Sequence, residues 1–279
     1  MATVLVFDIE TIPDVLGLRR LNEYPPNLSD AEVAQLAMTE RAEKTGSDFL
    51  PHYLQRIIAI SCVIRRTTKE GLPQFKVGSL GESGDDEKTL VQSFFELIEK
   101  YTPQLVSWNG SGFDLPVLHY RALINQVAAP RYWEMGESKE NDSRDFKYNN
   151  YISRYHLRHI DLMDLLAKHN PRANAPLDSL AKLCGFPGKM GMDGSQVWSA
   201  FQDGKIHAIR NYCETDVVNT YLVYCQFQLM RGGFSQAEYD QELVFVKKCL
   251  EEQSKTLATA AAQADGSNHW RDYLAGFAD

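Results

Sequence analysis

The sequence predicts an α/β fold in which a mixed five-stranded sheet is flanked by helices. The order of its patterns is three strands, a helix, a strand, a helix, and then a further strand followed by helices. An antiparallel meander followed by alternating strands and helices favours a sheet that contains both strand directions. The expected strands cover residues 3–11, 55–65, 73–79, 104–108 and 159–162.

The first two strands are the most apolar. Residues 3–7 form a β-branched apolar run that is followed by carboxylates, which indicates a central strand buried on both faces. Residues 57–64 form the next apolar run. The polar turn at residues 67–72 would pair this second strand with the third.

Helical periodicity and capping residues define the helices. Ser29 or Asp30 can cap the first helix, and Asp86 and Glu87 favour the start of the second. The expected helices cover residues 29–44, 85–101, 115–125, 164–169, 177–183, 196–201, 206–230 and 236–262.

Two regions stand apart from this core. Residues 131–156 are polar, charged and without a period, so we expect an exposed insertion or a mobile loop. The last helix follows a double glycine at 232–233, and we expect the residues after it to be frayed. We therefore divide the chain into a domain of residues 1–231 and a C-terminal helical extension of residues 235–279.

The composition describes an ordinary globular protein and excludes several classes. Of 279 residues, 44% are hydrophobic, and no apolar run approaches the ~18 residues of a membrane span. No basic segment followed by an apolar stretch opens the chain, which argues against secretion. The 5 scattered cysteines form no CxxC pair and suit reduced thiols in the cytoplasm. The net charge of −8 argues at first against a nucleic-acid partner.

Asp8 and Glu10 lie two residues apart at the end of the first strand. The two-residue period of a strand places both carboxylates on the same face. Two like charges at a buried strand are costly unless something neutralises them, and a bound cation is the simplest neutraliser. The alternative is that both carboxylates lie in solvent at the strand end.

The segment from Asn109 to Asp114, Asn-Gly-Ser-Gly-Phe-Asp, follows another strand and opens a helix. Its glycines let the backbone approach another group closely. Asp114 can simply be favoured by the helix dipole, but its position after a strand places it near Asp8 and Glu10.

Tyr212 and Asp216 lie four residues apart on the long helix of residues 206–230 and therefore share one face. Glu214 lies between them, and we expect it to point into solvent. The alternative for the Tyr–Asp pair is a local hydrogen bond without a catalytic role.

Together these carboxylates form a set that suits hard divalent cations. Mg²⁺ and Mn²⁺ prefer carboxylate and water ligands, and a pair of ions about 4 Å apart can stabilise a phosphoryl displacement. The sequence contains no histidine or cysteine cluster that would favour zinc, and no GxxxxGK[ST] segment of a P-loop enzyme.

The three motifs resemble those of the DEDD superfamily of 3′–5′ exonucleases, which have a ribonuclease H-like fold. Phe7 to Thr11 is similar to the first motif, Asn109 to Asp114 to the second, and Tyr212 to Asp216 to the third in its tyrosine form. Within this subgroup, the chain is most similar to stand-alone relatives of the proofreading domain of family B DNA polymerases, over roughly residues 1–230.

The resemblance implies a role for each motif residue. Asp8 would bridge two Mg²⁺ or Mn²⁺ ions, Glu10 and Asp216 would complete the first site, and Asp114 would hold the second ion through water. Tyr212 would orient the attacking water. The implied reaction is hydrolysis from a 3′ end with release of nucleoside 5′-monophosphates.

Further residues are candidates for substrate binding. Thr11, Asn109 and Phe113 belong to the motifs, and Lys189 lies in a glycine-rich turn at residues 185–191 where it could contact a phosphate. The alternative for this turn is a plain helix end followed by a loop. Residues 144–159 interleave basic and aromatic side chains, which suits a single strand bordering the cleft, or else a loop anchored by tyrosines. Asp161 and Asp164 are expected to be structural.

The expected substrate is the 3′ end of single-stranded DNA. An exoribonuclease of the same fold is the first alternative, because only a contact with the 2′-OH would distinguish RNA. A catalytically idle nucleic-acid-binding module is the second, although such modules usually lack a metal ligand. The acidic net charge of −8 predicts a weak grip on long nucleic acid, and therefore a short or end-bound substrate.

Overall fold

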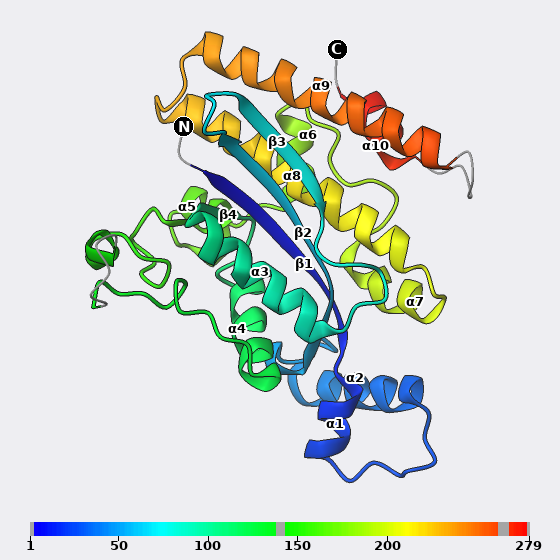
Figure 1. Ribbon diagram of the computed structural model, residues 1–279. Coiled ribbons are helices and arrows are strands. Elements are labelled where there is room, and N and C mark those ends of the chain that lie inside the picture. Colours follow the sequence, from blue (N-terminus) through cyan, green and yellow to red (C-terminus); the bar gives the residue numbers. More distant parts are fainter. Residues whose placement is uncertain (1–2, 138–142, 262–267, 278–279) are drawn as a thin grey trace.

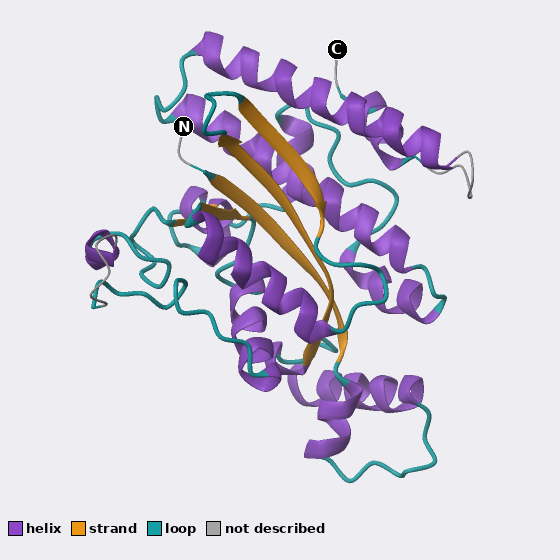
Figure 2. Ribbon diagram, in the orientation of Figure 1, coloured by secondary structure: helices purple, strands orange, loops and turns teal. Residues whose placement is uncertain are grey.

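The computed structural model describes residues 3–137, 143–261 and 268–277 and contains one five-stranded mixed sheet (Figures 1 and 2). Its strand order is β3-β2-β1-β4-β5, with β1 antiparallel to β2 and parallel to β4. The predicted α/β fold with a three-stranded meander followed by parallel strands is thus confirmed. The strands are β1 (Val4–Pro13), β2 (Gln55–Thr67), β3 (Pro73–Ser79), β4 (Gln104–Ser107) and β5 (His159–Asp161).

Strand β1 is central because its side chains are apolar on both faces. Leu5 and Phe7 contribute to one core cluster, whereas Val4 and Val6 contribute to another. All four are at most 2% exposed, as the β-branched run predicted. The sheet therefore holds any group on β1 between two packed layers.

Helices cover both faces of the sheet (Figure 1). α3 (Glu87–Tyr101) and α4 (Asp114–Asn125) lie on one face, and α8 (Ile206–Met230) crosses the other. No helix in the described ranges is both long and apolar enough to cross a membrane. The remaining α-helices are α1 (Val15–Leu21), α2 (Asp30–Thr45), α5 (Leu162–Leu166), α6 (Leu177–Leu183), α7 (Val197–Gln202), α9 (Gln236–Ala261) and α10 (His269–Ala275).

The segment between β1 and β2 projects from one end of the sheet as α1 and α2 (Figure 1). Ser29 is the N-cap of α2 and forms a capping box with Glu32, as the sequence allowed. Asp14 caps α1, a helix that the sequence did not predict. The four short 3₁₀ turns of the described chain are His52–Leu54, Ser143–Lys147, Pro171–Ala173 and Gly194–Gln196.

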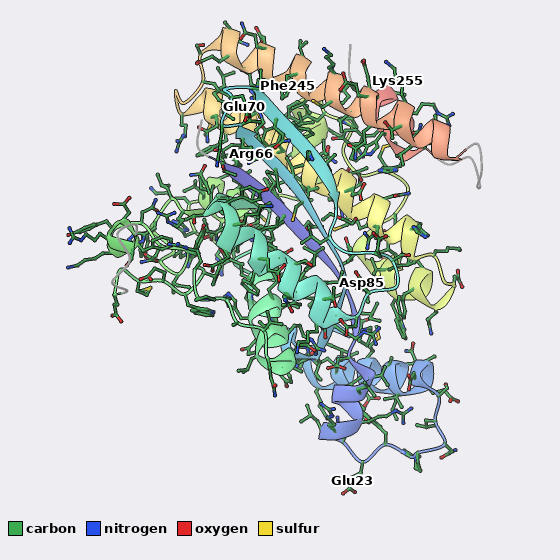
Figure 3. All side chains as sticks on the ribbon, in the orientation of Figure 1. Glu23, Arg66, Glu70, Asp85, Phe245 and Lys255 are labelled. Atoms are coloured by element: carbon green, nitrogen blue, oxygen red, sulfur yellow. The ribbon has the colours of Figure 1, made fainter. Side chains whose placement is uncertain are left out.

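The C-terminal helices α9 and α10 pack against the core that covers one face of the sheet. Phe245 on α9 is one of the side chains in this contact (Figure 3). The ring of Phe245 lies 5.0 Å from the Arg65 guanidinium of β2, and Arg65 also forms a buried ion pair with Glu242 at 2.7 Å. The expected fraying after α9 is wrong for α10, because Trp270 and Tyr273 are fully buried. The final residues, 278–279, lie outside the described residues.

Glu214 corrects a second expectation, because it does not point into solvent. Its Oε1 accepts hydrogen bonds from the backbone N–H and the hydroxyl of Ser79, both at 2.8 Å. Its Oε2 lies 3.2 Å from the Nε2 atom of His269. Glu214 therefore joins the end of β3 and the start of α10 to the middle of α8.

The segment 131–156 is folded around an aromatic core rather than being simply exposed. Tyr132, Phe146 and Tyr151 are at most 3% exposed. The Tyr151 hydroxyl donates to the Pro103 carbonyl at 2.7 Å, and the Arg158 guanidinium lies 4.1 Å from the ring centroid of Phe146. The expectation of an exposed insertion is thus wrong for these aromatic side chains, and residues 138–142 lie outside the described part.

Candidate active site

The predicted carboxylates meet in one cleft, which we call the carboxylate cleft. It has a volume of about 470 Å³ and lies between β1, the start of α4, and α8. The predicted site residues that line it are Asp8, Glu10, Asn109, Phe113, Asp114, Lys189, Tyr212 and Asp216.

Strand β1 presents Asp8 and Glu10 to this cleft. The strand continues to Pro13, two residues beyond the expected end, so the carboxylates lie within it rather than at a frayed terminus. Glu10 is only 8% exposed, so the alternative of a solvated strand-end acid is wrong for Glu10, whereas Asp8 is partly exposed to the cleft. The pairing with β2 shifts register between Glu10 and Thr11, and this irregularity directly follows the second carboxylate.

Asp114 is the first residue of α4 and is 3% exposed. Its Oδ1 accepts a hydrogen bond from the backbone N–H of Ile9 at 3.1 Å, so it lies against β1 between Asp8 and Glu10 in sequence. Phe113 occupies the N-cap position and makes no side-chain capping bond. Asp114 thus joins α4 to the central strand, which a simple capping role would not achieve.

The turn before Asp114 is held by Asp161, which the sequence marked only as structural. The two carboxylate oxygens of Asp161 accept from the backbone N–H groups of Asn109 at 3.0 Å and Ser111 at 2.8 Å. Gly110 is required here, because an added Cβ would lie 2.2 Å from the Ser107 Oγ atom. Asp161 is therefore a positioning residue of the cleft that local sequence patterns did not identify.

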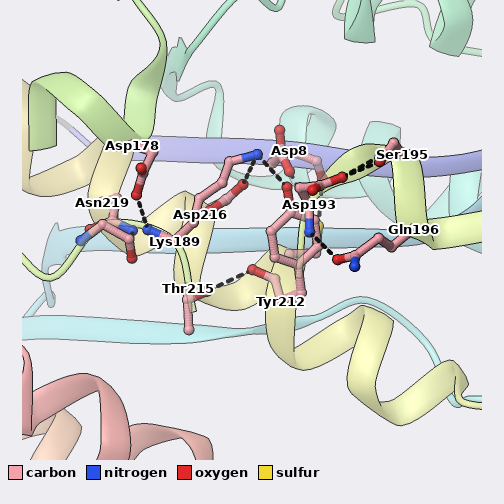
Figure 4. A network of polar contacts seen from close by, with 12 residues as sticks. Asp8, Asp178, Lys189, Asp193, Ser195, Gln196, Tyr212, Thr215, Asp216 and Asn219 are labelled. Carbon is pink, nitrogen blue, oxygen red and sulfur yellow. Dashed lines mark hydrogen bonds and ion pairs between the residues drawn. The ribbon is translucent and has the colours of Figure 1, made fainter. Parts of the chain in front are cut away.

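Helix α8 supplies Tyr212 and Asp216 to the cleft (Figure 4). Their side chains are buried, with exposed fractions of 4% and 5%. The Oδ1 atom of Asp216 is buried and has no hydrogen-bond partner among the described residues. The Nζ atom of Lys189 donates to the Tyr212 hydroxyl at 2.5 Å and lies 3.7 Å from the Oδ2 atom of Asp216.

The glycine-rich turn that carries Lys189 is anchored on both sides (Figure 4). The backbone N–H of Lys189 donates to Asp178 at 2.7 Å. Gly188 exchanges two hydrogen bonds with the side-chain amide of Asn219 on α8, at 3.2 and 2.8 Å. The turn is therefore more than a helix end, since it fixes the position of a lysine in the cleft.

Cys213 is a cleft neighbour that the motifs did not reveal. Its thiol lies 3.5 Å from the carbonyl oxygen of Asp8 and 3.6 Å from the carboxylate of Asp8. Burial and the nearby Asp8 raise the pKa of this thiol well above its ordinary value. The ligand atoms of Asp8, Glu10 and Cys213 lie within 4.8 Å of one another. Sulfur is a soft ligand, whereas Mg²⁺ and Mn²⁺ prefer oxygen, so the carboxylates dominate the donor set for these ions.

The electrostatics of the cleft favour an added cation. Burial, followed by repulsion from Asp114, raises the pKa of Asp8 well above its ordinary value. Burial also raises the pKa of Asp114 to about 7 and that of Asp216 to about 6, with Lys189 opposing the rise at Asp216. The crowded oxygens and the unpartnered Oδ1 of Asp216 fit a hard divalent cation.

Thr11 is the one predicted substrate-binding residue that does not line the cleft. Its hydroxyl donates to the Gln55 side chain at 3.0 Å, across the β1–β2 pair. Phe113 lines the cleft and contacts the rings of Phe49 and His52, each at a centroid distance of 5.6 Å.

The mixed sheet with buried acids beside its central strand defines an exonuclease fold of the ribonuclease H-like class. The chain belongs to the family described as a predicted 3′–5′ exonuclease related to the exonuclease domain of PolB, whose model matches residues 47–277. The predicted relationship to that polymerase domain is thus confirmed. The match includes Asp114, Tyr212 and Asp216 and extends through α10, but it begins after β1. No curated protein matches the chain.

Replacing Asp114 by asparagine should stabilise the metal-free protein at pH 8 but not at pH 4. The pKa of Asp114 is about 7 in the folded protein and about 4 in the unfolded chain. Between these two pH values the unfolded chain loses the proton more readily, so the free energy of unfolding of the wild type falls as the pH rises. Asparagine removes that loss and can still accept the Ile9 N–H. We expect a gain of at least about 1 kcal/mol, or about 2–4 °C in Tm.

The measurement is the thermal midpoint of both proteins in EDTA, and the difference between them cancels the contributions of other titrating groups. Added Mg²⁺ should stabilise the wild type more than the variant. A variant that is no more stable than the wild type at pH 8 would show that ionisation of Asp114 does not destabilise the folded protein.

Proposed function

We propose that this protein is a metal-dependent 3′–5′ exonuclease of the tyrosine subgroup of DEDD enzymes. Its proposed reaction is hydrolysis of the terminal phosphodiester of single-stranded DNA, or of a 3′ overhang, with release of nucleoside 5′-monophosphates. The observation that carries the proposal is the convergence of four acids, Tyr212 and Lys189 in one cleft. The family supports the general activity.

The carboxylates would hold two Mg²⁺ or Mn²⁺ ions. Asp8, Glu10 and Asp216 are the proposed ligands of the first ion, and Asp8 with Asp114 those of the second. Such ions lower the pKa of bound water and neutralise the phosphate charge. The chain's own contribution is to hold these oxygens in a fixed arrangement, which is the main requirement of phosphoryl transfer.

Tyr212 is proposed to orient the attacking water. Burial, followed by repulsion from Asp216, raises the pKa of its hydroxyl, so it keeps its proton. Lys189 donates a hydrogen bond to the oxygen of the same hydroxyl. The Tyr212 proton therefore does not point at Lys189 and can be donated to another acceptor in the cleft. The Lys189 ammonium also supplies the positive charge that a terminal phosphate requires.

We propose DNA as the substrate strand. RNA is the alternative, and a direct comparison of the two strands distinguishes them. The net charge of −8 supports a substrate held at its 3′ end rather than along a broad basic surface. All five cysteines are free, which supports a cytoplasmic location.

The proposal is tested with oligonucleotides labelled at the 5′ or the 3′ end. With Mg²⁺ or Mn²⁺, the 3′ label should leave first as a mononucleotide, the 5′-labelled strand should shorten stepwise, and EDTA should stop both. Asp8→Asn should lower the rate at least about a hundredfold, because it removes the shared ligand. Lys205→Ala is the control, because this side chain is 61% exposed, pairs with Asp203 and does not line the carboxylate cleft.

Activity that survives EDTA, or an Asp8→Asn variant that cleaves like the wild type, would contradict the two-metal proposal. Release of internal fragments would indicate an endonuclease instead. A set of DNA and RNA strands of matched sequence then identifies the preferred sugar.

Tyr212→Phe should lower kcat by at least about tenfold and leave metal affinity unchanged. The ring keeps its packing and only the hydroxyl that contacts Lys189 is lost. Turnover is followed by nucleotide release, and metal affinity by the rise in Tm with added Mn²⁺. If turnover were unchanged, the tyrosine would have only a structural role.

A further inference from the structure

A second cavity of about 820 Å³ lies beside the carboxylate cleft, and we call it the aromatic pocket. It is bounded by the turn after β4, by α5 and by residues 132–133 and 151–157. Asn109, Met163 and Asn174 line both this pocket and the cleft. A polymer bound across these shared residues would therefore occupy both cavities at once.

Two exposed aromatic rings line the aromatic pocket. Trp133 is 51% exposed and Tyr155 is 83% exposed. The Trp133 ring is held by Tyr132, at a centroid distance of 5.3 Å, and by His119 at 4.9 Å. Tyr132 is itself buried and stacks on Tyr151 at 5.5 Å. Trp133 is thus an exposed ring on a fixed aromatic support, which lowers the entropy cost of stacking on it.

The charges in the pocket suit a nucleotide because its acids are already neutralised. Asp161 binds two backbone N–H groups, and Asp164 binds Arg154 and His169. Asp164 accepts from the Nε and Nη2 atoms of Arg154, at 3.0 and 2.6 Å. The Nη1 atom of Arg154 makes no hydrogen bond or ion pair with the described residues, and the side chain is 54% exposed. Arg154 is therefore held in place with donor capacity left for a phosphate.

We propose that the aromatic pocket binds a nucleotide of the substrate strand adjacent to the one removed in the carboxylate cleft, with its base on Trp133 and its phosphate near Arg154. This inference rests on the proposed exonuclease function. The volume lies within the ~300–1,000 Å³ typical of small-ligand sites. Continuity with the cleft favours a strand over a separate small molecule, and stacking requires an unpaired base.

The test is the dependence of affinity on strand length. Binding of 5′-labelled DNA strands of one to eight nucleotides is measured by fluorescence anisotropy, with Ca²⁺ in place of Mg²⁺, for the wild type and for Trp133→Ala. The wild type should gain affinity between one and two or three nucleotides. Trp133→Ala should lose about tenfold for the longer strands and bind the mononucleotide unchanged. Tyr148→Ala is the control, since this 76% exposed ring lies in the same segment outside the pocket.

Three results would overturn the inference. Unchanged affinity of Trp133→Ala for every length would exclude the pocket, and an equal loss for the mononucleotide would make it a separate nucleotide site. A loss of affinity in the Tyr148→Ala control would make the effect nonspecific. If Trp133→Ala failed to fold, Tyr155→Ala and Trp133→Phe would serve, with a loss expected for the first and near-normal binding for the second.

Failure of this inference is distinguishable from failure of the proposed function. Hydrolysis of the p-nitrophenyl ester of thymidine 5′-monophosphate requires only the carboxylate cleft. Activity on this ester without Trp133-dependent strand binding would support the proposed exonuclease activity and contradict the nucleotide site in the aromatic pocket. Trp133-dependent strand binding by a protein that hydrolyses nothing would do the opposite.

Discussion

The crowding of buried carboxylates at β1 is the constraint on which the rest of the structure depends. Four acids from three elements share a small cleft, and burial together with mutual repulsion raises the pKa of Asp8 and Glu10 well above their ordinary values. Among the described residues that line the cleft, Lys189 is the one cation, and its Nζ atom lies 3.7 Å from the Oδ2 atom of Asp216. Such an arrangement costs stability in a metal-free protein, which supports the proposed role of the cleft as a metal site.

The surrounding fold holds these acids close together against their mutual repulsion. β1 is packed on both faces, and Asp114 fastens α4 to the Ile9 backbone at 3.1 Å. On the opposite side, Glu214 ties α8 to β3 and α10, while the buried pair of Arg65 and Glu242 ties α9 to β2. The C-terminal helices thus support the helix that carries Tyr212 and Asp216.

The sequence could predict the parts of the site that follow from local periodicity. The two-residue period of β1 predicted that Asp8 and Glu10 share a face, and the four-residue spacing on α8 predicted the same for Tyr212 and Asp216. That these two pairs meet in one cleft was implied by the resemblance of the motifs to the DEDD family. It could not predict Cys213, the role of Asp161 or the burial of Glu214, because their partners lie 50 or more residues away. The packing of α10 and of Tyr132 was missed for the same reason, since aromatic anchors in polar segments have no period. For residues 144–159, the alternative of a loop anchored by tyrosines agrees with the buried Tyr151.

The most direct test of the central claim is a count of bound ions. Calorimetric titration of the wild-type protein with Mn²⁺ in the presence of a nucleoside 5′-monophosphate should give two ions per chain. The Asp216→Asn variant should bind one ion or none, because it removes the carboxylate whose Oδ1 is buried without a partner. A wild-type protein that binds no Mn²⁺, or an Asp216→Asn variant that still binds two ions, would contradict the assignment of the cleft as a two-metal site.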